Sequence, residues 1–144
     1  MRFYTLLIFL FVLVNTFSSD QISVLEHPRL FWTSQNDSVV RHSLKSSVYA
    51  ERLKNLSFQC DTLINTPLLE RKKIGKRLLS VSREAERRII MLSFMWRLTG
   101  DERYAERAKS ELINVCSFSD WNPSHFLDVA EMCIAVSVGY DWLY

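Results

Sequence analysis

The stretch SREAERRIIMLSFMWRLTGDERYAERAKSELINV, residues 82–115, decides the fold class. Its apolar residues recur at steps of three and four, which is the period of an amphipathic helix. They are Ala85, Ile89, Leu92 and Trp96 before the interruption and Tyr104, Ala108, Leu112 and Val115 after it. Gly100 suits the left-handed position that ends a helix, and Asp101 suits the cap of the next one. The stretch therefore predicts two antiparallel helices joined by a tight turn.

The same period extends to both sides of this hairpin. Residues 34–65 have a helical pattern that ends at Asn65-Thr66-Pro67, and Ser82 is a plausible cap for the helix that follows. Asn122-Pro123 resembles a cap followed by proline in the first turn of another helix. The predicted inner face of that last helix comprises Val129, Cys133, Val136, Tyr140 and Leu143. No strand pattern occurs, so we expect an all-α fold of antiparallel helical hairpins.

Composition narrows the class of protein. The 144 residues are 48% hydrophobic and contain only 3 Gly and 3 Pro, which excludes a disordered chain and speaks against a β-sandwich. The net charge of +2 gives no reason to expect nucleic acid as a partner.

The first residues have the features of a secretion signal. Arg2 precedes the apolar run of residues 6–14, which is too short to cross a bilayer, and small residues follow. We predict a signal peptide over residues 1–19, an uncleaved membrane anchor being the alternative. The mature chain, from residue 20, would then be secreted or periplasmic, with no membrane partner after cleavage.

Three cysteines and the carboxyl-terminal residues lead to two further expectations. Cys60, Cys116 and Cys133 favour buried thiols, although an oxidising compartment would permit one disulfide among them. The last helix reaches Trp142-Leu143-Tyr144 without a stop signal or polar tail. We therefore expect residues 20–144 to be the amino-terminal part of a longer protein.

The candidate ligand-binding residues lie where the last predicted helix begins. Trp121 offers a flat apolar face for stacking on a sugar ring, and Asn122, His125 and Asp128 offer hydrogen bonds to hydroxyl groups. His125, Asp128 and Glu131 share one edge of the helix. The alternative roles are structural: Asn122 as a cap, Asp128 in favourable interaction with the helix dipole, and His125 bonded to Asp128. The spacing matches no common metal site.

Five cations lie within seven residues at 71–77. They are Arg71, Lys72, Lys73, Lys76 and Arg77. Such a cluster suits an anionic polysaccharide, and the alternative is a solvated loop without a ligand.

Four stretches together resemble a known family. They are HPRLF at 27–31, WRLTGDERY at 96–104, DWNPSHFLDVAEM at 120–132 and GYDWLY at 139–144. In this order they resemble the amino-terminal helical domain of the heparinase II/III-like polysaccharide lyases. The resemblance implies the first part of an incomplete α/α-toroid, followed by a β-sandwich domain in the missing carboxyl-terminal part of the chain.

The resemblance also implies an activity. Such lyases cleave an anionic polysaccharide that contains uronic acid, heparin-like or alginate-like, by β-elimination. The catalytic residues implied lie beyond Tyr144, so none is assigned here, and any cofactor is unknown. Trp121, Asn122, His125 and Asp128 are implied only as residues of the substrate cleft.

Two other functions remain open. A non-enzymatic helical repeat protein would repeat at about 34 residues, and residues 85–100 show no similarity to the later helices. An α/α-toroid glycoside hydrolase would need two carboxylates facing each other across a cleft, whereas Asp128 and Glu131 are neighbours on one helix.

Overall fold

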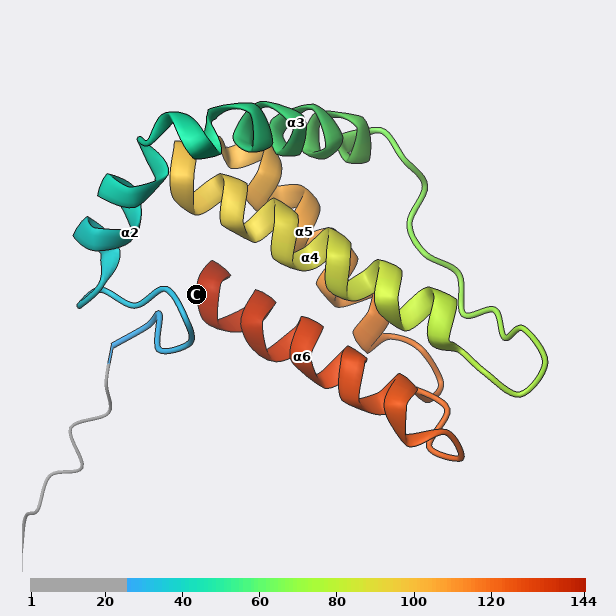
Figure 1. Ribbon diagram of the computed structural model, residues 1–144. Coiled ribbons are helices and arrows are strands. Elements are labelled where there is room, and N and C mark those ends of the chain that lie inside the picture. The colour runs from blue at the N-terminus through green and yellow to red at the C-terminus, as the bar shows by residue number, and fades with distance from the viewer. Residues whose placement is uncertain (1–25) are drawn as a thin grey trace, which may run out of the picture.

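The computed structural model describes residues 26–144, which form five helices and no strand (Figure 1). The helices are α2 (Asp37–Leu44), α3 (Ser47–Ile64), α4 (Leu79–Thr99), α5 (Glu102–Cys116) and α6 (Phe126–Leu143). The all-α prediction is confirmed. None of these helices is long and apolar enough to span a membrane. The predicted signal peptide, residues 1–19, lies outside the described residues.

Helices α3 to α6 alternate in direction along the chain, so that α4 and α6 run the same way (Figure 1). The most extensive helix contacts are those of α4 with α6 and with α5. Gly139 permits the close approach of α6, because a Cβ atom there would lie only 2.4 Å from Cγ2 of Ile89. A core of Leu78, Ala85, Ile89, Val115, Met132 and Ala135 fills the space among α4, α5 and α6.

The turn between α4 and α5 follows the sequence prediction. Gly100 has a φ of 75°, which glycine adopts without the steric cost of a Cβ atom. The side chain of Asp101 caps α5 by accepting a hydrogen bond from the backbone N–H of Arg103 at 3.0 Å. The hairpin of α4 and α5 is therefore confirmed at the residues that predicted it.

Three predicted helix boundaries are wrong. Residues 34–65 form two helices, because Ser46 is extended and starts α3 as its cap. Helix α4 begins at Leu79, so Ser82 lies in its first turn and is not the cap. Helix α6 begins after His125, which occupies the cap position. Asn122, the predicted cap, has a φ of 57° and lies in the preceding loop.

The predicted buried face of α6 is wrong by one residue. The residues that are buried at helical spacing are Asp128, Met132, Ala135, Gly139 and Trp142, whereas Cys133 and Tyr140 are exposed. The helix is apolar on most sides, so its apolar residues alone do not distinguish the buried face. Two aspartates lie on the buried face because each accepts hydrogen bonds there.

The cysteines also differ from expectation. Cys60 is buried, and burial raises the pKa of its thiol to about 11. Cys116 and Cys133 are exposed, so the expectation of three buried thiols is wrong for these two. All three are free thiols in the structure.

The amino-terminal segment, residues 26–32, is fastened to the end of α6. The carboxylate of Asp141 accepts hydrogen bonds from the backbone N–H groups of Arg29 and Leu30, each at 2.8 Å, and contacts Nδ1 of His27 at 2.7 Å. Trp32 is buried, but Leu30 and Phe31 are exposed, so only the tryptophan of this segment packs into the domain as expected.

Candidate functional site

The candidate site lies at the end of the molecule where α4 and α6 begin. Two loops meet there, residues 66–78 before α4 and residues 117–125 before α6 (Figure 1). Arg71 joins them, because its Nε donates to the backbone carbonyl of Asp120 at 2.9 Å and its Nη2 to the Asp120 carboxylate at 2.6 Å. The loop of residues 66–78, which contains the five cations and which we call the basic loop, is therefore a neighbour of the loop that contains Trp121. About fifty residues separate the two in the sequence.

Asp128 is completely buried at this junction. Its carboxylate accepts hydrogen bonds from the backbone N–H of Leu78 at 2.8 Å and from Nδ2 of Asn122 at 2.6 Å, and it contacts Nδ1 of His125 at 2.9 Å. Burial alone would raise the pKa of this carboxyl, but the three hydrogen bonds outweigh burial and lower it. Asp128 is thus an ionised anchor between α6 and the start of α4.

Asn122 belongs to the same buried junction. Only 3% of the residue is exposed, and its Nδ2 also donates to the backbone carbonyl of Lys76 at 2.9 Å. Asn122 and Asp128, which were expected as residues of a substrate cleft, are both buried here and have their polar atoms bonded within residues 26–144. A buried polar group is stable only when it is hydrogen-bonded. The hydrogen bonds of Asn122 and Asp128 reach the backbone of Lys76 and Leu78, so these two residues hold the loops together.

Trp121 and His125 are only partly buried. The indole Nε1 of Trp121 donates to the carbonyl of Val115 at 2.8 Å, and the ring packs against the core of α4, α5 and α6. His125 has 28% of its side chain exposed. No residue among 26–144 bonds to its Nε2 atom, so His125 is the predicted site residue with a ring nitrogen available to a ligand.

Glu131, on the same helix, has structural partners. Its carboxylate accepts from the hydroxyl of Ser82 at 2.6 Å and from Nε of Arg83 at 3.1 Å. These contacts join α6 to α4.

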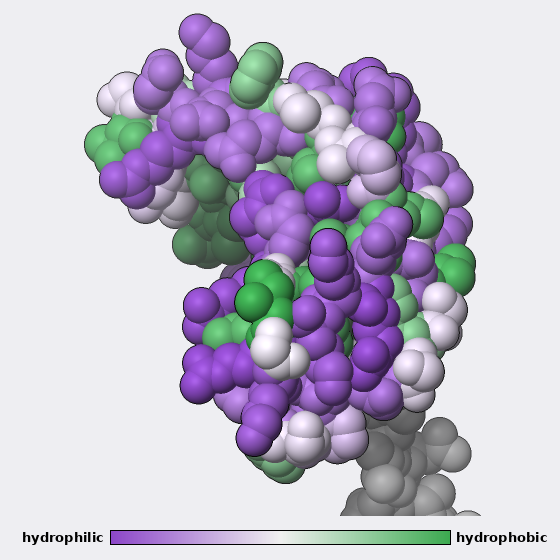
Figure 2. Space-filling model, turned by 90° about the vertical axis from the view of Figure 1, so that its right-hand side faces the viewer, coloured by the Kyte–Doolittle hydropathy of each residue, from purple (hydrophilic) through white to green (hydrophobic). Residues whose placement is uncertain are grey.

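The basic loop presents its remaining cations to solvent. Lys72, Lys73, Lys76 and Arg77 are exposed around a turn in which Gly75 has a φ of 61°. The isolated bridge between Ile74 and Arg77 closes this turn. Figure 2 shows this end of the molecule, and hydrophilic residues dominate the visible surface.

Sequence reasoning missed a second buried ionic group, between α4 and α5. The fully buried Glu111 accepts hydrogen bonds from Nη1 of Arg88 at 2.9 Å and from Arg107. Arg88 also donates to the backbone carbonyl of Pro67, and this bond holds the beginning of the basic loop against α4. The (i, i+4) spacing of Arg107 and Glu111 indicates an ion pair on one helix. It does not indicate the contact with Arg88, which lies on α4.

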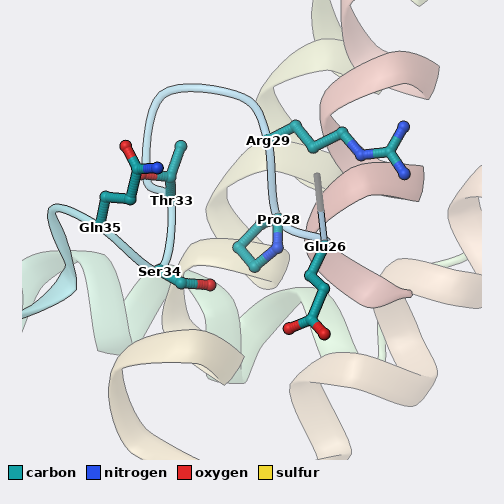
Figure 3. A pocket seen from close by; sticks show the side chains of 6 residues that line it. All are labelled: Glu26, Pro28, Arg29, Thr33, Ser34 and Gln35. Carbon is teal, nitrogen blue, oxygen red and sulfur yellow. The ribbon is translucent and has the colours of Figure 1, made fainter. Parts of the chain in front are cut away.

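A pocket of about 380 Å³ lies among residues 26–35 (Figure 3). In Figure 3 the side chain of Arg29 extends beside α6, whereas Gln35 and Thr33 lie on the other side of the pocket. None of the predicted site residues lines it. Within residues 26–144, no group of three or more metal-binding side chains comes together.

No known protein family matches the sequence, and no curated protein matches it at a significant level.

Proposed function

We propose that the chain is the amino-terminal helical region of a secreted polysaccharide lyase that acts on uronic-acid polysaccharide. The carrying observation is the meeting of the basic loop and the loop of residues 117–125, joined by Arg71 and Asp120. The charge of the basic loop made it a candidate contact for a polyanion. The loop of residues 117–125 was a candidate contact because of its residue types and the family resemblance. Two independent lines of sequence reasoning thus concern one end of the molecule.

The arrangement of the helices agrees with this proposal. Alternating helices, with α4 beside the parallel α6, suit the first hairpins of an incomplete α/α-toroid. The stretches at 27–31 and 139–144, both part of the resemblance, contact each other through Asp141. In the proposed whole protein a β-sandwich domain follows and completes the cleft.

The proposed reaction is β-elimination. It requires one group to neutralise the uronate carboxylate, a base to remove the proton at C5, and an acid to protonate the departing oxygen. We assign these roles to residues beyond Tyr144, and we propose no cofactor. A hydrolase reaction at Asp128 and Glu131 gains no support. Asp128 is fully buried, and the carboxylate of Glu131 accepts hydrogen bonds from Ser82 and Arg83.

The test is a product assay on the longest reading frame that contains these 144 residues. The protein is incubated with heparin, heparan sulfate and alginate, and ultraviolet absorbance and new reducing ends are both measured. We expect an absorbing unsaturated uronate product. New reducing ends without absorbance would indicate a hydrolase, and the absence of both would favour a binding module; either result would overturn the proposal.

A further inference from the structure

The surface around the basic loop has an excess of positive charge. The side chains of Lys72, Lys73, Lys76 and Arg77 form no hydrogen bond or ion pair with any residue of the described range 26–144. Two exposed or partly exposed carboxylates lie close by. Asp120 is paired with Arg71 and also interacts electrostatically with Lys73, and Glu70 lines the same surface depression as Lys72, so the five cations of residues 71–77 outnumber them. An anionic ligand would therefore find several cations available without displacing an existing partner.

The imidazole of His125 is held in a defined orientation by Asp128, which also bonds the backbone N–H of Leu78 directly after the basic turn. The ionised carboxylate of Asp128 has no proton to donate, so the hydrogen bond between them requires the proton on Nδ1 of His125. In the neutral ring, Nε2 then has a free lone pair. This atom is suited to accept a hydrogen bond from a hydroxyl group, such as that of a sugar.

The cations and the imidazole are parts of one connected unit. The backbone of Lys76 and Leu78 is bonded to Asn122 and Asp128, and Asp128 holds the ring of His125. The backbone at the end of the turn of residues 72–77 and the ring of His125 are therefore fixed relative to each other, and only the long cationic side chains have to be ordered when a ligand binds.

We propose that His125 and the basic turn of residues 72–77 together bind an acidic saccharide. The ammonium and guanidinium groups contact its carboxylate or sulfate groups, and Nε2 of His125 accepts a hydrogen bond from one of its hydroxyls. This inference rests on the proposed function, since it assigns part of the substrate to named side chains. It requires both charge and hydroxyl groups in the ligand, and a DNA strand carries the charge but has no hydroxyl groups along its backbone.

The first experiment measures the binding of the chain to a heparin oligosaccharide and to an alginate oligosaccharide, as a function of salt concentration. The double variant Lys76→Ser and Arg77→Ser should weaken binding about tenfold at low salt, with a weaker salt dependence. The matched control is Arg52→Ser with Lys54→Ser, which removes the same two charges from exposed positions of α3. An equal loss in the control would overturn the proposal, whereas the two oligosaccharides distinguish sulfate from carboxylate as the preferred group.

The second experiment isolates Nε2 of His125. In His125→Asn the side-chain amide can still donate to Asp128, but the atom equivalent to Nε2 is absent. We expect about three- to tenfold weaker saccharide binding with an unchanged melting temperature. Unchanged affinity in a folded variant would overturn the role of His125. Single-stranded DNA is the control ligand, because it has no hydroxyl group for Nε2 to accept from, so the wild type and the variant should bind it equally. A loss of DNA binding as large as the loss of saccharide binding would overturn the specific role of Nε2.

These outcomes are independent of the proposed activity. If the chain binds acidic saccharides as described but the long reading frame cleaves none, the proposed function fails and this inference stands. If cleavage occurs but the variants bind like the wild type, only this inference fails.

Discussion

Asp128 shows what sequence can and cannot indicate about a single residue. Its spacing from His125 put the two side chains on one edge of the predicted helix, with a bond between them as the structural alternative, and the structure has that bond. Its burial depends on the backbone N–H of Leu78, fifty residues earlier, which needs an acceptor where α4 begins. Helical periodicity indicates the neighbours on the same helix and not the partner on another segment, so the burial of Asp128 against Leu78 could not be predicted.

Replacing Asp128 with alanine should therefore destabilise the protein. The change leaves the backbone N–H of Leu78 and the amide of Asn122 without their buried acceptor, and we expect a loss of at least about 2 kcal/mol in the free energy of unfolding. Urea denaturation followed by circular dichroism measures it. Glu51→Ala, at an exposed position of α3, is the control and should change stability by less than about 0.5 kcal/mol. Equal stability of both variants would contradict the anchoring role.

At the scale of the elements, prediction succeeded where a helix has two distinct faces. Helices α4 and α5 carry charged residues opposite their apolar residues, and the turn at Gly100 and Asp101 fixes where one ends and the next begins. Helix α6 has few charged residues, so a face shifted by one residue fits its apolar pattern equally well. Small residues decide the packing there, since Gly139 admits Ile89 where a larger side chain would not fit.

A pair of neighbouring substitutions tests the corrected face of α6. Met132 is fully buried in the core and Cys133 is exposed, whereas the sequence pattern predicted the reverse for Cys133. We expect Met132→Ala to lower the free energy of unfolding by about 2 to 5 kcal/mol because it leaves a cavity. Cys133→Ala should cost less than about 0.5 kcal/mol. A larger effect at Cys133 than at Met132, measured by chemical denaturation, would restore the original face.

At the scale of the whole molecule, buried aspartates fix both ends of α6. Asp128 joins its first turn to the start of α4, and Asp141 joins its last turn to the amino-terminal segment. The sequence showed these acidic residues but not their distant backbone partners, so the meeting of the two loops could not be predicted. The contacts of Asp128 also arrange the surface proposed to bind an acidic saccharide, which makes the integrity of that junction a condition for the binding.

These two anchors also predict how stability depends on pH. For Asp128 and Asp141, burial tends to raise the carboxyl pKa, but hydrogen bonds to the ionised form prevail and hold the pKa below its ordinary value. The unfolded chain then binds protons more readily than the folded one. The stability that these groups contribute is complete above the unfolded pKa of about 3.9 and is lost as the pH falls through the lower folded pKa. Melting temperatures should therefore decrease below about pH 4.

The variant Asp141→Asn separates this effect from general acid denaturation. It removes one group that titrates differently in the two states, so its melting temperature should decrease less steeply between about pH 4 and pH 2.5 than that of the wild type, even if the variant is less stable at neutral pH. Thermal unfolding followed by circular dichroism gives both slopes. Glu51→Gln, at an exposed position, should keep the wild-type slope. If Asp141→Asn also kept it, the carboxylate of Asp141 would not be the ionised anchor of the amino-terminal segment.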